Sequence, residues 1–551
     1  MSKPQGALYK RTILQQTDFF EIVACEWGKD DISPLHDHGF SQCYTLVQEG
    51  TFENLTDFGL KKELTLKESG QVIITPVGSK HEIKCLSKTG KTFHVYTPKL
   101  AEKKPTPLFQ TLSNADLSKS INLQLQPKGL AWEKLVALLQ AVADQSVSTN
   151  SVYFMNQLFS GVTSQMLAAE DLIAKTKASM ATFEASSVLN LIEIEVVQNL
   201  CRQIGWLNST SSTADGIQVP GGSSANFMAL QCARHKKNPN YKINGLPANT
   251  KYKIFGSKES HYSLQKACVV MGLGLNALVQ VNTDSDGKMS LQDLEFKIGK
   301  SISAGETPLI VYATAGTTVL GAFDPIPEIA KICQKNNIWL HVDAAWGGPA
   351  LFSKKLRHHI QGSELADSWT FDAHKFYGAG LTCAFFLTQH TQTLFEANDV
   401  KGGEYLFHET ENFDRGRLSW QCGRRADAVS FWTLWKSLGT EGLTQFIDDT
   451  LDLRDKLTVW IKDQPRLNLI TEPDFLNVCV QVLPPKDLNS SEELIKSWSN
   501  KIRQNIKNKN LTLVNYSATA DSTSFLRLIL AHPFLKIEDL KNILTWAIEE
   551  E

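Results

Sequence analysis

The sequence predicts a multidomain protein with a small β-barrel at its amino end, a larger α/β region, and a smaller α+β domain at its carboxyl end. Three observations support this prediction. Residues 8–98 contain short β-like runs separated by turn residues, a pattern typical of a sandwich or small barrel. From about residue 130, helical segments alternate with short apolar runs, which indicates a mostly parallel sheet covered by helices. At 551 residues, the chain is also too long for a single hydrophobic core.

Changes in composition set the expected domain boundaries. The β-like runs of the first module lie at residues 19–27, 43–49 and 71–76. Prolines and lysines then mark residues 101–129 as a linker. Apolar residues recur at helical spacing over 130–144, where the second module begins. We therefore expect a first domain at 1–100 and a second at 130–551, whose smaller carboxyl-terminal domain starts near residue 445.

Composition and charge exclude several classes of partner. The net charge of -2 predicts neither a nucleic-acid-binding surface nor strong steering of anions. No stretch approaches the ~20 apolar residues of a membrane span, and charged residues interrupt the first thirty positions, which argues against a signal peptide. The ten cysteines stand apart without a CxxC pair, as expected of free thiols in a reducing compartment. We expect a cytoplasmic protein.

Polar residues follow the ends of three apolar runs in the second module. The runs read as buried strands at residues 308–314, 338–344 and 368–373. Ligand sites in parallel sheets lie beyond the carboxyl ends of the strands. Thr314, Asp343 and Lys375 fall at or just past such ends, so the sequence predicts a site there.

Three segments together indicate a pyridoxal-phosphate site. The glycines and serines of residues 220–226, before a helix, suit a phosphate. In residues 341–348, the Asp343 carboxylate could bind the pyridinium nitrogen and keep the ring an electron acceptor. In residues 369–376, Lys375 could bind the cofactor aldehyde. Taken singly, each has a plain alternative: a loop, a helix-capping aspartate or a surface lysine. The ordered set favours the cofactor.

The same region resembles one enzyme family. From about residue 151 to residue 533, the chain is similar to the group II pyridoxal-phosphate decarboxylases, in the branch that acts on glutamate and cysteine sulfinate. This resemblance implies fold type I, which is aspartate aminotransferase-like, and a homodimer. The matching stretches are Asn156-Gln157-Leu158-Phe159-Ser160-Gly161, His261-Tyr262-Ser263, Ala313-Thr314-Ala315-Gly316-Thr317-Thr318 and Gln421-Cys422-Gly423-Arg424-Arg425.

The resemblance also implies a role for each residue of the cofactor site. Lys375 carries the cofactor and is catalytic together with His261, which stacks on the ring. Asp343 pairs with the ring nitrogen, Ala345 packs on the other ring face, and His374 lies beside the phosphate. The residues assigned to the cofactor are Ser223, Ser224, His261, Thr314, Asp343, Ala345, His374 and Lys375.

Substrate recognition follows from the resemblance as well. Arg527 would bind the distal acid group of the substrate, a task that suits a planar guanidinium. Gln157, Phe159 and Ser160 would line the substrate pocket, and their stretch is closer to cysteine sulfinate decarboxylases than to glutamate decarboxylases. Aspartate, glutamate and cysteate remain alternatives. Residues 408–420 lack the tyrosine with which related enzymes protonate the reaction intermediate; we still expect decarboxylation rather than oxidative deamination.

The first module contains His36-Asp37-His38 and, further on, His81. Residues i and i+2 of a strand share one face, so His36 and His38 can point the same way. Imidazoles suit iron, zinc, copper and nickel. The plain alternative is a pair of exposed histidines near a turn.

Residues 9–98 resemble cysteine dioxygenase, a cupin-fold thiol dioxygenase. The matching stretches are Tyr9-Lys10-Arg11, Cys25-Glu26-Trp27-Gly28, His36-Asp37-His38 with Ser41 and Cys43, and His94-Val95-Tyr96. The resemblance implies a ferrous iron site and oxidation of cysteine by O₂. It assigns the metal to His36, His38 and His81, the substrate carboxylate to Arg11, and catalytic roles to Cys43, His94 and Tyr96. Cys43 and Tyr96 occupy the positions that form a thioether crosslink in some members.

Together the two resemblances imply a bifunctional enzyme of hypotaurine and taurine biosynthesis. The first module would oxidise cysteine to cysteine sulfinate, and the second would decarboxylate that product to hypotaurine. One alternative keeps the decarboxylase, gives it aspartate, glutamate or cysteate, and gives the first module a different cupin reaction. Another makes the first module a sensor without metal.

Overall fold

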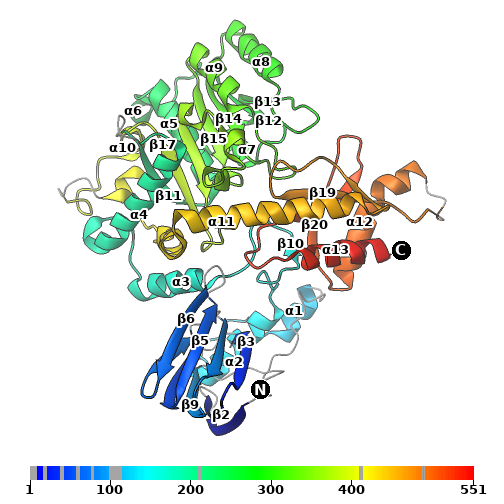
Figure 1. Ribbon diagram of the computed structural model, residues 1–551. Helices are drawn as coiled ribbons and strands as arrows, with labels where there is room; N and C mark the ends of the chain where they lie inside the picture. The colour runs from blue at the N-terminus through cyan, green and yellow to red at the C-terminus, as the bar shows by residue number, and fades with distance from the viewer. Residues whose placement is uncertain are drawn as a thin grey trace.

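The computed structural model describes residues 9–16, 21–37, 42–57, 62–75, 80–97, 114–207, 213–408, 414–486, 488 and 491–550. Figure 1 shows the amino-terminal strands at one end, a large α/β domain, and a small carboxyl-terminal α+β domain. The long helix α11 (Ala428–Lys462) runs from the large domain to the small one.

The amino-terminal module consists of two antiparallel sheets, with strand orders β1-β2-β9-β4-β7 and β3-β8-β5-β6. Alternate residues of β2, among them Val23 and Trp27, pack against Phe52 of the other sheet in a shared core. The expected strands at 19–27, 43–49 and 71–76 are confirmed as β2, β4 and β7, whereas a closed barrel stays a prediction. The strands are β1 (Lys10–Gln16), β2 (Glu21–Gly28), β3 (Ile32–Asp37), β4 (Gln42–Glu49), β5 (Thr51–Asp57), β6 (Lys62–Glu68), β7 (Val72–Thr75), β8 (Lys80–Cys85) and β9 (Thr89–Thr97).

The large domain is built on a seven-stranded sheet with the order β11-β17-β16-β15-β14-β12-β13. Strands β12 to β16 are parallel, and β17 lies antiparallel between β16 and β11. The three strands expected at 308–314, 338–344 and 368–373 are confirmed as the neighbours β14, β15 and β16. The strands are β11 (Asp215–Pro220), β12 (Tyr252–Ser257), β13 (Leu278–Val281), β14 (Thr307–Thr314), β15 (Trp339–Ala344), β16 (Ser368–Asp372) and β17 (Cys383–Thr388).

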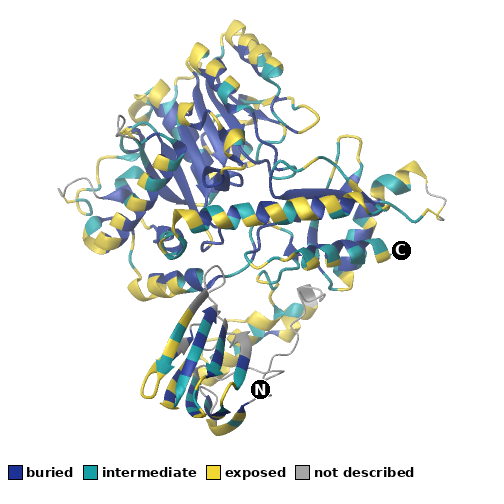
Figure 2. Ribbon diagram, viewed as in Figure 1, coloured by how far each residue is buried: buried dark blue, intermediate teal, exposed yellow. Residues whose placement is uncertain are grey.

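Helices cover both faces of this sheet because its strands are apolar on both sides. In β14, Val311 and Ala313 enter the core shared with α8 and α9, whereas Ile310 and Tyr312 enter the core shared with α5 and α7. Figure 2 shows the buried strands between helices whose outer faces are exposed. The helices are α4 (Phe183–Ile204), α5 (Gly222–Lys237), α6 (Tyr241–Asn244), α7 (Ser263–Val270), α8 (Leu291–Ser303), α9 (Ile326–Asn336) and α10 (Thr393–Asn398).

The small domain contains a sheet with the order β10-β20-β21-β19-β18, which packs against α12, while α13 packs against α11 and α12. Its expected start near residue 445 falls inside α11, so a continuous helix rather than a loop joins it to the large domain. Helix α11 bends at Gly439, whose φ of 68° is a conformation that glycine adopts readily. The elements are β10 (Phe154–Met155), β18 (Leu467–Leu469), β19 (Asn477–Val482), β20 (Leu513–Ala518), β21 (Ser524–Ile529), α12 (Glu492–Asn508) and α13 (Ile537–Glu549).

The segment before the large domain is partly helical. The interval expected as a linker, 101–129, includes α1 (Asn114–Ser120), and the helix expected at 130–144 is confirmed as α2 (Trp132–Gln145). Helix α3 (Ser164–Thr176) follows and packs against α11.

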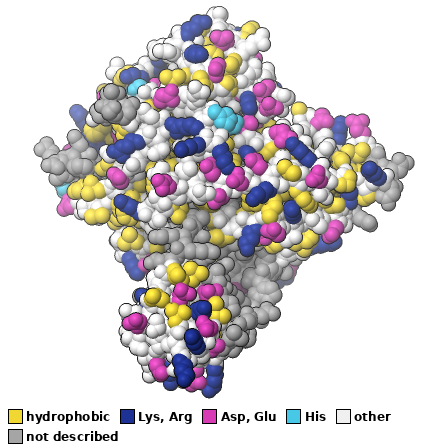
Figure 3. Space-filling view, in the orientation of Figure 1, with side chains coloured by type: hydrophobic (Ala, Val, Ile, Leu, Met, Phe, Trp, Pro, Cys, Tyr) yellow, Lys and Arg dark blue, Asp and Glu magenta, His cyan; other side chains and the backbone are white. Residues whose placement is uncertain are grey.

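Basic and acidic side chains are interspersed on the face shown in Figure 3, in keeping with the net charge of -2. Among the residues that the structure describes, none of the helices combines the length and the apolar character that crossing a membrane requires.

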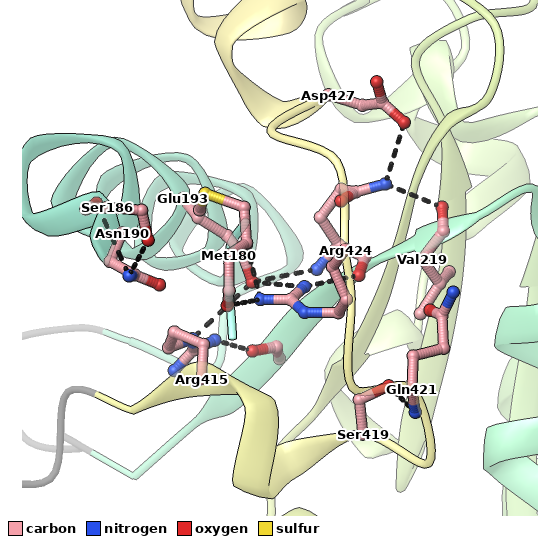
Figure 4. Close-up of polar contacts among 12 residues, drawn as sticks. Met180, Ser186, Asn190, Glu193, Val219, Arg415, Ser419, Gln421, Arg424 and Asp427 are labelled. Carbon is pink, nitrogen blue, oxygen red and sulfur yellow. Dashed lines mark hydrogen bonds and ion pairs between the residues drawn. The ribbon is translucent and has the colours of Figure 1, made fainter. Parts of the chain in front are cut away.

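A buried ion-pair network fixes β11, the strand that leads into α5. Glu193 of α4 is fully buried, and its carboxylate accepts hydrogen bonds from Arg424 at 3.1 and 3.3 Å (Figure 4). Arg415 lies 3.5 Å from the same carboxylate and donates to the carbonyl oxygen of Gly216. Glu193 accepts from the N–H of Gln218, and Arg424 donates to the carbonyl oxygen of Gln218. The network therefore joins α4, β11 and the segment that precedes α11.

Replacing Glu193 should destabilise the fold, because the substitution Glu193→Gln removes the counter-ion of the buried Arg424 guanidinium and one of the two carboxylates that Arg415 contacts, the other being Asp215. We expect the free energy of unfolding, measured by urea denaturation, to fall by about 3–5 kcal/mol. Lys175→Ala is the control, since it breaks the exposed Lys175–Asp171 pair of α3; it should change the same free energy by less than about 1 kcal/mol. Equal effects of the two substitutions would contradict the assigned role of the network.

Candidate active site

A cavity of about 210 Å³ lies at the carboxyl edge of the parallel strands. The strand register explains its position: Thr314 of β14 pairs with Asp343 of β15, and Asp343 pairs with Thr370 of β16. The cavity is lined by Pro220, Gly221, Gly222, Ser223, Asn226, His261, Thr314, Gly316, Thr318, Asp343, Ala345, Trp346, Asp372, His374 and Lys375.

The turn between β11 and α5 forms one wall of the cavity. Gly221 has a φ of 87° and precedes the first helical residue. A Cβ atom on Gly222 would lie 2.8 Å from Asp372 Oδ2 and 3.0 Å from Ala345 Cβ, so only glycine fits there. Helix α5 starts five residues earlier than the expected helix at Phe227, which places Ser223 and Ser224 in its first turn. The Ser224 hydroxyl donates to the Pro220 carbonyl at 3.1 Å, and Ser223 lines the cavity.

Asp343 is one of two buried aspartates that line the cavity, the other being Asp372. Its Oδ1 accepts from the N–H of Ala345 at 3.1 Å, and its Oδ2 accepts from Asn226 Nδ2 at 2.7 Å. Beside it, the Thr314 hydroxyl is buried and has no hydrogen-bond partner among the described residues. Each carboxylate oxygen of Asp343 thus has an N–H donor that fixes its orientation at the cavity wall.

Lys375 lies just beyond β16. Its Nζ is 3.2 Å from Asp372 Oδ2, while Asp372 Oδ1 is buried with no hydrogen-bond partner within the described part of the chain. Next to it, His374 Nδ1 lies 2.9 Å from the Cys383 carbonyl oxygen, and burial lowers the pKa of His374. The pair provides an amine and a neutral imidazole at the cavity wall.

His261 reaches the cavity from the segment between β12 and α7. Its Nδ1 accepts from the N–H of Ser263 at 3.3 Å, and its ring centroid lies 4.3 Å from that of Tyr262. Partial burial lowers the pKa of His261, which favours a neutral ring at neutral pH. A neutral imidazole is suited to packing against an aromatic ligand.

The predicted substrate residues separate into two groups. Arg527 of β21 is buried, and its Nη1 donates at 2.9 Å to the carbonyl oxygen of Thr318, which lines the cavity. Gln157 is exposed, Phe159 packs on Phe154, and the Ser160 hydroxyl lies 3.5 Å from the Thr149 carbonyl. These three side chains do not line the cavity; the backbone of their segment touches Arg527 through the carbonyl of Asn156 at 3.4 Å.

The predicted residues of the amino-terminal module are described in part. His81 lies in β8 opposite His36 of β3, and its Nδ1 is 2.9 Å from the Thr75 hydroxyl. His38 and the side chains of His36 and Tyr96 lie outside the described residues, and within those described no three potential ligand side chains form a metal site.

Other predicted residues of that module lie in its core. The His94 ring lies between the hydroxyls of Thr45 and Thr92, each at 2.9 Å, and Cys43 Sγ is 3.8 Å from its Nδ1. Arg11 contacts the buried carboxylate of Glu21.

Asn226 and Asp372 line the cavity but received no role from the sequence. Asn226 falls within the glycine-serine segment, and its position four residues after Gly222 places it on the same face of α5. Asp372 stands three residues before Lys375, but nothing in the pattern showed that its side chain turns back toward that lysine. Helical spacing could have identified Asn226 as a cavity residue. The position of the Asp372 side chain depends on the turn after β16, which the sequence did not reveal.

Comparisons with known proteins match most of the chain, and the alignment with acidic amino acid decarboxylase GADL1 of Mus musculus, at 34% identity, covers 92% of this chain and 95% of that protein. Residues 115–483 match the family described as the pyridoxal-dependent decarboxylase conserved domain. The chain is 35% identical over 438 residues to cysteine sulfinic acid decarboxylase of Rattus norvegicus, covering 78% of this chain and 88% of that protein. It is 36% identical over 437 residues to acidic amino acid decarboxylase GADL1 of Xenopus tropicalis, covering 78% and 84%. The crystal structure of mouse CSAD superposes with a TM-score of 0.76 at 33% identity, covering 80% of this chain and 92% of that one.

The pH dependence of stability should report on His341, which is buried in β15. Burial lowers the pKa of His341 to about 4, whereas in the unfolded chain it is about 6.5. Between these values the unfolded state binds the extra proton, so this contribution to stability is complete above pH 6.5 and is lost as the pH falls toward 4. We expect the wild type to lose about 2 kcal/mol more free energy of unfolding than His341→Gln between pH 7 and pH 5. Urea denaturation at both pH values measures this difference. Equal losses of free energy of unfolding in the wild type and in His341→Gln would show that His341 does not stay neutral.

Proposed function

Because the chain belongs to the pyridoxal-dependent decarboxylases, we propose that its cavity decarboxylates a small acidic amino acid, with cysteine sulfinate as the preferred substrate and hypotaurine as the product. The observation that carries the proposal is the meeting of Lys375, Asp343 and Ser223 in one cavity at the carboxyl edge of the sheet. Relatives of about one-third identity are a cysteine sulfinic acid decarboxylase and an acidic amino acid decarboxylase. Aspartate, glutamate and cysteate are the alternative substrates.

The cavity fits pyridoxal phosphate in three respects. The start of α5 and Ser223 provide N–H and hydroxyl donors for a phosphate group, at the end of the helix that favours an anion. The buried Thr314 hydroxyl, which has no partner among the described residues, is available to a bound molecule. The glycine at position 222 leaves the space that a side chain would fill.

When bound, the cofactor provides a protonated aromatic ring that accepts the electron pair left behind as the carboxyl group departs as carbon dioxide. In our assignment, Lys375 carries the cofactor through its amine, and Asp343 pairs with the ring nitrogen. Asp372 Oδ2, 3.2 Å from Lys375 Nζ, is placed to accept the proton that this amine must lose before it binds an aldehyde. His261 and Ala345 would cover the two faces of the ring, and the neighbouring Thr314 and His374 would contact its substituents.

Arg527 is the residue that we assign to the distal acid group of the substrate. Its guanidinium is buried, its Nε has no hydrogen-bond partner within the described residues, and it lies against Thr318 of the cavity. Burial lowers the pKa of Arg527, and an anionic partner would compensate the cost of burying this cation. The planar fork suits a sulfinate or carboxylate group.

We also propose a homodimer, as is typical of the family. Helix α2 has no buried residue, and Leu130, Trp132, Val136 and Leu139 expose apolar surface along it and just before it. Such a face is stabilised when another surface covers it. A second copy of the chain is the partner that we assign.

Lys375→Ala should abolish decarboxylation, because the substitution removes the only side-chain amine that lines the cavity among the described residues. With pyridoxal phosphate present, we expect the conversion of cysteine sulfinate to hypotaurine, followed by mass spectrometry, to fall by about a thousand-fold or more. The exposed Lys354 provides the control, and Lys354→Ala should leave the rate unchanged. Faster turnover of aspartate, glutamate or cysteate by the wild type would replace the substrate assignment, and residual activity of Lys375→Ala near the wild-type rate would refute the site.

For residues 1–100, we propose an iron-dependent thiol dioxygenase that oxidises cysteine to cysteine sulfinate. The register supports it: His36 and His81 are direct cross-strand partners, and so are Cys43 and Tyr96. The hydrogen bond between Thr75 and His81 Nδ1 fixes that ring in the manner of metal-binding histidines. Arg11, assigned to the substrate carboxylate, contacts Glu21, so a bound carboxylate would have to compete with that residue.

The dioxygenase proposal predicts that protein supplied with ferrous iron, O₂ and cysteine forms cysteine sulfinate. His81→Ala should reduce this oxidation to the uncatalysed rate and lower the bound iron, while decarboxylation of added cysteine sulfinate continues. The reciprocal control, Lys375→Ala, should oxidise cysteine and accumulate cysteine sulfinate. Cysteine binding without iron or oxidation would instead support the sensor alternative.

A further inference from the structure

A buried chain of hydrogen bonds ends on the carboxylate of Asp343. It begins at the indole of Trp339, whose Nε1 donates to the Ser368 hydroxyl at 2.8 Å. Ser368 lies 2.8 Å from His341 Nδ1, and His341 Nε2 lies 3.0 Å from Asn226 Oδ1. Asn226 Nδ2 then lies 2.7 Å from Asp343 Oδ2. All five residues are buried, so solvent does not compete for these groups.

The chemistry of the groups fixes the direction of this chain. A carboxylate only accepts hydrogen bonds, so the amide nitrogen of Asn226 must face Asp343, and the amide oxygen must face His341. An unprotonated Nε2 would be a second acceptor only 3.0 Å from that oxygen, and the two would repel each other, which places the proton of His341 on Nε2. Because burial lowers the pKa of His341 to about 4, the ring is neutral and has a single N–H. Its Nδ1 therefore accepts from Ser368, whose oxygen accepts from Trp339.

The side chain of Asn226 forms hydrogen bonds through both of its polar atoms. Its Nδ2 donates to Asp343 and to the Ser263 hydroxyl at 2.9 Å, and its Oδ1 also accepts from the Thr370 hydroxyl at 2.9 Å. Its carbonyl oxygen accepts from the Tyr312 hydroxyl at 2.7 Å. With every polar atom of its side chain paired, the amide cannot rotate without breaking several buried hydrogen bonds.

Asn226 also links the two ends of the cavity. It lies on α5 three residues after Ser223, so one rigid helix presents the phosphate-binding turn and the support of Asp343. The N–H groups of Asn226 and Ala345 both donate to Asp343, and these two donors fix the orientation of its carboxylate. Without the amide, Asp343 would lose one of these donors and be free to turn away from the cavity.

We propose that Asn226 is a positioning residue for the ring nitrogen of the cofactor: its hydrogen bond holds the Asp343 side chain at the cavity wall, in the orientation needed to pair with that nitrogen. This inference rests on the proposed pyridoxal-phosphate site. A residue that only stabilises the core would affect the binding of every ligand, whereas the effect of Asn226 should be confined to ligands that have a ring nitrogen.

The test compares the affinity of the whole chain for pyridoxal phosphate and for its carbocyclic analogue, in which a C–H group replaces the ring nitrogen. Quenching of tryptophan fluorescence reports binding, since Trp346 lines the cavity. We expect the wild type to prefer pyridoxal phosphate, and Asn226→Ala to reduce this preference by about ten-fold or more, the loss expected for one hydrogen bond to a charged group. Asn226→Asp, which has nearly the same shape, should reduce it as well, because two adjacent carboxyl groups share a proton.

Asn190 supplies the matched control. It is also a fully buried asparagine, and its amide donates to Thr182 and Ser186 in α4, away from the cavity. Asn190→Ala should lower the stability of the protein and leave the preference between the two ligands unchanged. Folded Asn226 variants that keep the wild-type preference, or that lose affinity for both ligands equally, would overturn the proposal for Asn226. A wild type that binds no pyridoxal phosphate would instead overturn the proposed function.

Discussion

The parallel alignment of β14, β15 and β16 is the constraint on which the site depends. The carboxyl ends of parallel strands lie at the same edge of a sheet. Residues at the ends of neighbouring strands are therefore close in space even when they are distant in the chain. The pairing of Thr314 with Asp343, and of Asp343 with Thr370, sets a hydroxyl beside a carboxylate at that edge. A shift of this register by one residue would turn Asp343 to the other face of the sheet. The cavity therefore depends on the same contacts that hold the sheet together.

Buried charges are held in the same way on both sides of the β11–α5 turn. On one side, Glu193 and Arg424 bond to the N–H and carbonyl of Gln218 in β11. On the other side, Asn226 of α5 bonds to Asp343 of β15. A charge inside a protein is tolerated only when donors or counter-ions surround it. The turn that lines the cavity is thus fixed from two directions by groups that cannot be left unpaired.

The two modules place their chemistry differently. In the large domain, the predicted cofactor residues come from turns at strand ends, where backbone groups and helix starts are available to a ligand. In the amino-terminal module, His36 and His81 lie opposite each other on the paired strands β3 and β8, so the pairing of the strands sets the distance between them. If both proposed activities reside in one chain, the product of the first module is formed close to the second, and tethering raises its local concentration.

The sequence alone determined the parallel strands, several strands of the first module and the placement of Thr314, Asp343 and Lys375 at strand ends, because buried strands are apolar throughout and polar groups follow them where they end. It did not determine which partners these groups have. Asn226 is 117 residues from Asp343 in the chain, and Asp372 turns back to Lys375 only through the turn after β16. Tertiary structure likewise decided that Gln157 is exposed and that Arg11 contacts Glu21. These partners depend on how turns direct side chains and on which distant segments meet, and the spacing of residues along one strand or helix does not determine either.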